Sequence, residues 1–104
     1  MIRSASIMKL YEGKAEEYEK RHNAIWPEMV NSIKQSGGKN YSIFLNKATN
    51  ELFSYLEIED EQKWAARAGE EITKKWWDYM ADIMETNPDN SPVCINLDEV
   101  FHLD

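Results

Sequence analysis

The sequence has little of what supports disulfide, metal or nucleotide chemistry. It contains one cysteine, Cys94, and therefore cannot form an internal disulfide. No cluster of histidine and cysteine has the spacing of a zinc site. A glycine-rich phosphate loop, a nucleophile elbow and a metal-binding histidine pair are also missing. The sequence therefore gives no indication of a zinc site, a phosphate-binding loop or a serine-hydrolase site.

Long apolar runs and an excess of positive charge are missing as well. No stretch approaches the roughly 20 apolar residues that cross a bilayer, and residues 1–10 alternate in polarity, unlike a signal peptide. Twelve basic against 19 acidic residues give a net charge of −7, which disfavours nucleic acid, anionic membranes and acidic substrates. We expect one cytoplasmic domain, residues 1–104, whose partner is a neutral small molecule such as a sugar.

Hydrophobic periodicity predicts the first elements of the fold. Residues 2–10 alternate as a strand does. Apolar residues at steps of three and four predict a helix over residues 12–35, in which Pro27 should cause a kink or a short break. Gly37-Gly38 should end this helix.

The remaining elements complete a recognisable order. Residues 40–47 and 51–59 predict a β-hairpin, and Asp60 is a suitable N-cap for a helix through Trp64. A further helix should run from about residue 70 to Asn87-Pro88, and residues 93–103 should form a last strand. This order predicts an α+β class, ferredoxin-like fold, with an antiparallel sheet and helices on one face.

Both faces of the predicted sheet carry large apolar side chains. Tyr41 and Ile43 alternate with Phe44 in one strand, and Phe53 alternates with Leu52 in the next. Helices cover only one face of such a sheet, so the other face also needs a cover. The simplest cover is the sheet of a second copy of the chain.

Five side chains are candidates for sugar chemistry. His22 lies one helical turn after Tyr18, and histidine is the natural proton carrier near neutral pH. Tyr41 and Tyr18 could donate hydrogen bonds to sugar hydroxyls while their rings pack on its C–H face. Of Trp76 and Trp77, which point about 100° apart on a helix, one should pack inward and the other should line a cavity, an edge or an interface. A core role remains an alternative for His22 and for the two tyrosines, and interface packing remains an alternative for the tryptophan pair.

Two other groups of residues are weaker candidates. The loop of residues 87–92 could offer amides to a polar ligand, or it could be only a rigid polar turn. The acidic pairs show no placement across a scissile bond, and we interpret them as solvated helix faces.

Several motifs together resemble the L-rhamnose mutarotase family. The segment Arg21-His22-Asn23-Ala24-Ile25-Trp26-Pro27-Glu28 resembles the signature around the family's catalytic histidine, although Ala24 stands where some relatives have proline. The resemblance continues over nearly the whole chain. Its other motifs are Asn40-Tyr41, Trp76-Trp77-Asp78-Tyr79-Met80 and Asn87-Pro88-Asp89-Asn90-Ser91-Pro92-Val93.

The resemblance implies an isomerase that exchanges the α and β anomers of L-rhamnose. It implies no cofactor and no metal, and a homodimer assembled as a dimeric α/β barrel. By motif match, His22 would be the catalytic proton donor, and Tyr18, Tyr41, Trp76 and Trp77 would bind the substrate. Two alternatives stay open, namely a non-catalytic sugar-binding module and a cofactor-free oxygenase or haem-degrading protein of the same fold.

Overall fold

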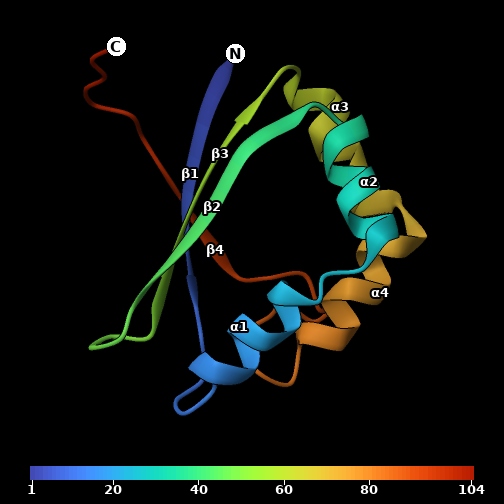
Figure 1. The fold of residues 1–104 in the computed structure, drawn as a ribbon, viewed down its shortest axis with the longest axis vertical. Helices are drawn as coiled ribbons and strands as arrows, with labels where there is room; N and C mark the ends of the chain where they lie inside the picture. Colours follow the sequence, from blue (N-terminus) through green and yellow to red (C-terminus); the bar gives the residue numbers. More distant parts are fainter.

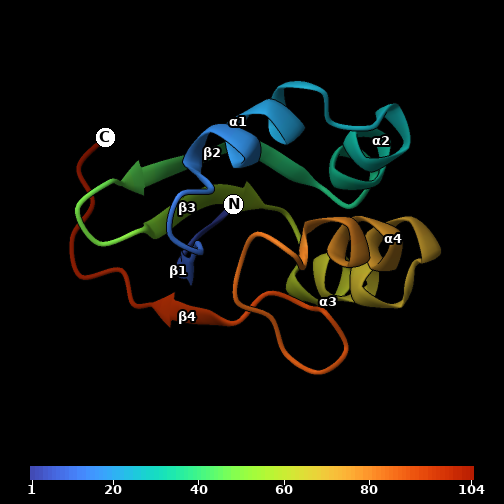
Figure 2. The same cartoon turned by 90° about the horizontal axis from the view of Figure 1, so that it is seen from below.

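The computed structural model describes all 104 residues and contains one four-stranded antiparallel sheet (Figure 1). The strand order is β2-β3-β1-β4. The strands are β1 (Ile2–Lys9), β2 (Gly38–Asn46), β3 (Glu51–Ile58) and β4 (Cys94–Leu97). The helices are α1 (Ala15–Asn23), α2 (Pro27–Gln35), α3 (Glu61–Ala65), the 3₁₀ helix η1 (Ala66–Gly69) and α4 (Glu71–Met80). All of them lie on one side of the sheet (Figures 1 and 2), so the predicted α+β, ferredoxin-like arrangement is confirmed.

Proline divides the predicted first helix into two. The helix α1 ends at Asn23, and α2 begins at Pro27, where the missing N–H of proline costs no hydrogen bond. Trp26 precedes it with an extended backbone, at φ −64° and ψ 137°, as the residue before proline prefers. The second helix ends next to Gly37, whose φ of +85° is left-handed. The predicted break and the predicted end are both confirmed.

A bulge near the start of β2 sets the position of Tyr41. The pairing of β2 with β3 shifts between Lys39 and Ser42, so that β2 carries one extra residue there. Asn40 adopts a positive φ of 50° within this bulge. Bulges of this kind re-aim neighbouring side chains, and Tyr41 lines the cavity on the helical side of the sheet.

Two predicted boundaries near the C-terminus are wrong. The helix α4 ends at Met80, seven residues before the predicted stop, because the segment that follows pairs with the end of β1. The N–H of Tyr11 donates to the carbonyl of Ile83 at 3.0 Å, and Leu10 bridges to Met84. The last strand stops at Leu97 rather than near residue 103, and the residues after it make no sheet pairing.

The core lies between the sheet and the helices. It is formed by apolar residues of both layers: Leu10, Tyr18, Met29, Leu52, Trp76, Met80, Ile83 and Met84. The opposite face of the sheet is open, and Phe44 and Ile95 are 67% and 63% exposed on it. The expectation of apolar side chains on both faces is therefore confirmed. No helix has the length and apolar character needed to cross a membrane.

Candidate active site

A cavity of about 1210 Å³ lies between the sheet and the helical layer, and its lining is mostly apolar. The sequence-predicted site residues come from three elements: α1, β2 and α4. All of them line this one cavity: Tyr18, His22, Tyr41, Trp76 and Trp77. Their convergence from distant parts of the chain makes the cavity the candidate site.

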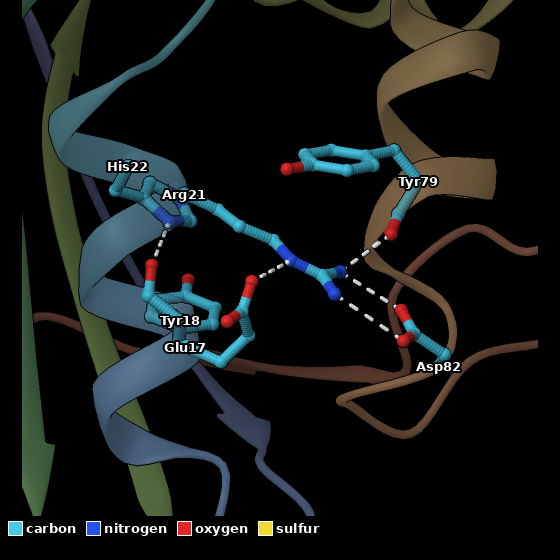
Figure 3. Close-up of polar contacts among 6 residues, drawn as sticks. All are labelled: Glu17, Tyr18, Arg21, His22, Tyr79 and Asp82. Atoms are coloured by element: carbon cyan, nitrogen blue, oxygen red, sulfur yellow. Dashed lines mark hydrogen bonds and ion pairs between the residues drawn. The ribbon is translucent and has the colours of Figure 1, made fainter.

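His22 is held in a single orientation by its neighbours. Its Nδ1 lies 3.0 Å from the carbonyl oxygen of Tyr18 (Figure 3). A carbonyl oxygen only accepts hydrogen bonds, so Nδ1 carries the proton and Nε2 keeps its lone pair. The imidazole stacks on the Tyr18 ring at 4.2 Å between centroids and meets Trp76 edge-on at 5.4 Å. Burial lowers the pKa of His22, which favours the neutral ring.

The two tyrosines supply neutral hydroxyl groups. Tyr18 is only 8% exposed, and burial, with a smaller contribution from nearby Tyr41, raises its pKa. Tyr41 is 41% exposed as a whole residue, yet burial of its hydroxyl end raises its pKa too. Both phenols therefore remain protonated around neutral pH and can donate hydrogen bonds.

The two adjacent tryptophans divide as expected, with Trp76 packed inward and Trp77 at the cavity, and Trp76 also reaches the cavity. Trp76 is 7% exposed, belongs to the core, and packs edge-on against Trp26 at 5.0 Å. Trp77 is half-buried and also lines the cavity. Both side chains reach the cavity, although they point about 100° apart, because α4 itself forms a wall of it.

Arg21 is a positioning residue that sequence reasoning missed. Its Nε donates to Glu17 at 2.8 Å, and its Nη1 donates to Asp82 at 2.8 Å and to the Tyr79 carbonyl at 2.7 Å (Figure 3). Its guanidinium also lies 4.5 Å from the centroid of the Tyr79 ring. These contacts fix α1 to the end of α4, and so fix the adjacent His22 against the α4 wall. Two sequence signals were available, namely the i,i+4 spacing to Glu17 and the place of Arg21 at the start of the segment that resembles the family signature.

The polar loop before β4 is hydrogen-bonded within itself and to α4. The Nδ2 of Asn87 donates to Ser91 Oγ at 3.0 Å, and the Nδ2 of Asn90 donates to Asp78 at 2.9 Å. These amides are already engaged, and among the loop residues only Pro92 lines the cavity. The geometry thus favours the interpretation of this loop as a rigid turn.

Comparison with known proteins gives a full-length result. The model of the L-rhamnose mutarotase family matches residues 3–103. The chain belongs to this family. It is 62% identical over 104 residues to an L-rhamnose mutarotase of Lachnoclostridium phytofermentans, and 54% identical over 104 residues to one of Bacillus subtilis, with all of each chain covered.

Solved structures agree with the family and with the fold. The crystal structure of an L-rhamnose mutarotase from Formosa agariphila matches with a TM-score of 0.93 and 45% identity, covering 100% of both chains. A putative antibiotic biosynthesis monooxygenase from Nitrosomonas europaea matches with a TM-score of 0.64 and 14% identity, over 95% of this chain and 89% of that one. The second likeness concerns the fold alone.

Proposed function

We propose that this protein is an isomerase that interconverts the α and β anomers of L-rhamnose by acid–base chemistry at His22. The observation that carries the proposal is the state of His22: a neutral imidazole with Nδ1 bonded to a carbonyl and Nε2 without a partner in the chain, in a cavity walled by aromatic rings. Such a nitrogen is ready to accept a proton from a sugar hydroxyl. Membership of the family supports this substrate.

The reaction requires two proton transfers around the pyranose ring. Nε2 of His22 removes the proton from the hydroxyl on C1, the C1–O5 bond breaks, and an aldehyde forms. A tyrosine hydroxyl, from Tyr18 or Tyr41, gives a proton to O5. The C1–C2 bond then rotates, O5 attacks the other face of the carbonyl, and both protons return. The enzyme ends unchanged: His22, which became protonated during ring opening, donates that proton to the carbonyl oxygen during ring closure, and the O5 proton returns to the tyrosine.

The tryptophans would hold the sugar during this exchange. Trp76 and Trp77 present ring surface to the cavity, and aromatic rings pack well on the C–H faces and the methyl group of a deoxy sugar. We assign substrate binding to them and to both tyrosines. Holding the ring near His22 while the open chain rotates is the part of catalysis that positioning supplies.

Anomer exchange measured by NMR tests this proposal. Saturation at one anomeric proton of L-rhamnose should transfer to the other faster with the protein than in buffer. Exchange at the buffer rate with folded protein would refute the enzyme assignment. Sugar binding without exchange would instead indicate a binding module, and haem binding seen by absorbance would indicate the haem-degrading alternative.

We also propose that two copies pair through their open sheet faces as a dimeric α/β barrel. Phe44, Phe53, Ile95 and Leu97 leave 36–67% of their surface exposed on that face or at its edge, and monomers rarely expose such contiguous apolar area. The tail after β4 adds Val100 and Phe101, which are 94% and 71% exposed. A second copy with two-fold symmetry covers the same patch on both chains.

Light scattering tests the dimer. The protein should have twice the mass of the chain at micromolar concentration, and Phe44→Glu should reduce it to the mass of one chain. Glu16→Gln, on the helical side, serves as the control and should leave the dimer intact. A monomeric mass for the unchanged protein would refute this assembly.

A further inference from the structure

Arg67 of η1 is a buried cation with an incomplete set of partners. It is 9% exposed. Its Nε donates to Ser32 Oγ at 3.1 Å, its guanidinium lies 4.3 Å from the centroid of the Trp64 ring, and its Nη2 lies 4.0 Å from the sulfur of Met29. No carboxylate contacts it directly. The nearest link to one is through Ser32, whose hydroxyl donates to Glu70 at 2.7 Å.

The free side of this guanidinium belongs to the cavity wall. Arg67 lines the cavity, and its Nη1 makes no hydrogen bond within the chain. Nη1 is not fully buried, so it can donate a hydrogen bond to an acceptor in the cavity, whether water or a ligand. A second polar group among the residues that line the cavity is also unpaired, since the hydroxyl of Thr73 is buried, at 2% exposure of the residue, without a hydrogen-bond partner.

The place of Arg67 relative to His22 defines which part of a sugar it could reach. Tyr18 stacks directly on His22. The Tyr41 ring lies 6.4 Å from the Trp64 ring between centroids, and the guanidinium of Arg67 lies over that same Trp64 ring. His22 with Tyr18, and Arg67 with Trp64 and Tyr41, are thus two groups that line the same cavity. A pyranose whose C1 lies at His22 would have its remote end available to the second group.

We propose that Arg67 is a specificity-determining residue that donates hydrogen bonds to sugar hydroxyls remote from C1, with Thr73 as a second contact. The inference rests on the proposed function. A neutral diol suits this site better than an anion, because Trp64 and, through Ser32, Glu70 already compensate part of the charge of Arg67. The fork of donors on a guanidinium matches two neighbouring oxygens.

Two substitutions separate this role from a structural one. Arg67→Met keeps the length of the side chain and removes its donors, and replacing a buried charge by an apolar group is often neutral or stabilising. We expect KM for L-rhamnose to rise about tenfold to hundredfold, with an unchanged or higher Tm. A merely structural role would lower Tm and leave KM unchanged. Arg3→Met is the matched control, because Arg3 pairs with Glu99 away from this cavity, and it should leave KM unchanged.

Deoxy sugars test the assigned contact itself. With the unchanged protein, 3-deoxy- or 4-deoxy-L-rhamnose should show a raised KM, and Arg67→Met should lose that discrimination for at least one of them. Thr73→Val should raise KM for L-rhamnose by a smaller factor. Normal KM and unchanged discrimination in Arg67→Met would overturn the inference while anomer exchange, and with it the proposed function, stands. Tighter competition by a sugar carboxylate than by L-rhamnose, lost in Arg67→Met, would also overturn it, in favour of an anion site.

Discussion

Replacing His22 has calculable and separable effects on stability and on catalysis. His22→Ala removes the stacked contact with Tyr18, the edge contact with Trp76 and the hydrogen bond from Nδ1. Aromatic pairs contribute about 0.5–1.5 kcal/mol each, and a hydrogen bond contributes about 0.5–1.5 kcal/mol. The expected loss of unfolding free energy is therefore about 2–4 kcal/mol. For a domain of this size, that corresponds to a fall in Tm of about 10–30 °C.

A second variant keeps the packing and removes the chemistry. Phenylalanine at this position retains a ring against Tyr18 and Trp76 but has no nitrogen to carry a proton. His22→Phe should therefore cost only about 1 kcal/mol, the value of the lost hydrogen bond. Its exchange rate should nevertheless fall as far as that of His22→Ala, by about 10²–10⁴-fold, the usual contribution of a general acid–base group.

The assay compares the two variants per folded molecule. Anomer exchange of L-rhamnose is followed by NMR at a temperature below both transitions, and thermal unfolding gives the folded fraction of each sample. If His22 only packs the core, His22→Phe keeps near-normal exchange and His22→Ala loses activity only in proportion to folded protein. Either of those results would remove His22 from the mechanism and direct attention to Tyr18 and Tyr41.

Three further predictions concern pH and the groups around His22. Because burial lowers the pKa of His22, kcat/KM should be flat from pH 7 upwards and should fall only below the ordinary histidine value of about 6.5. The free energy of unfolding should also fall below about pH 6.5, because the unfolded chain binds a proton there that the folded chain does not, and His22→Phe should lack this pH dependence. Tyr18→Phe and Tyr41→Phe should show in exchange kinetics which tyrosine donates the proton to O5. Replacing that tyrosine should lower kcat, whereas replacing the other should mainly raise KM. Arg21→Met should lower the free energy of unfolding by about 1–2 kcal/mol in urea titration and lower kcat through the loosened α1, whereas an unchanged kcat would contradict its positioning role.

Much of the fold was predictable because its signals are local. Pro27 starts a helix, Gly37 ends one with a left-handed backbone, and Asp60 caps the next, accepting hydrogen bonds from the N–H groups of Gln62 and Lys63. Each signal is set by one or two residues and survives in any tertiary context. The end of α4 was not predictable in this way. Periodicity extended the helix past Met80, whereas pairing with the end of β1 stops it there.

The site was predictable only in part, for a related reason. A histidine one turn from a tyrosine and a pair of tryptophans are unusual in sequence, and they resemble a family signature, so all five candidates could be named. Their placement around one cavity could be seen only in three dimensions. The bulge that carries Tyr41 left no clear signal, because a single asparagine with positive φ looks like any polar residue in a strand.

Arg67 shows where sequence reasoning has least power. In the sequence it stands in a short segment of alanine and glycine between two helices, and an arginine at such a position normally lies in solvent. Its burial follows from the short connection through η1, which brings the side chain under Trp64 and towards Ser32 of α2. Nothing in the spacing of Arg67 distinguishes it from Arg3, whose exposed pairing with Glu99 stabilises little. The two arginines differ only in what surrounds them, and for that reason the comparison of their methionine variants measures the contribution of the cavity rather than that of a positive charge.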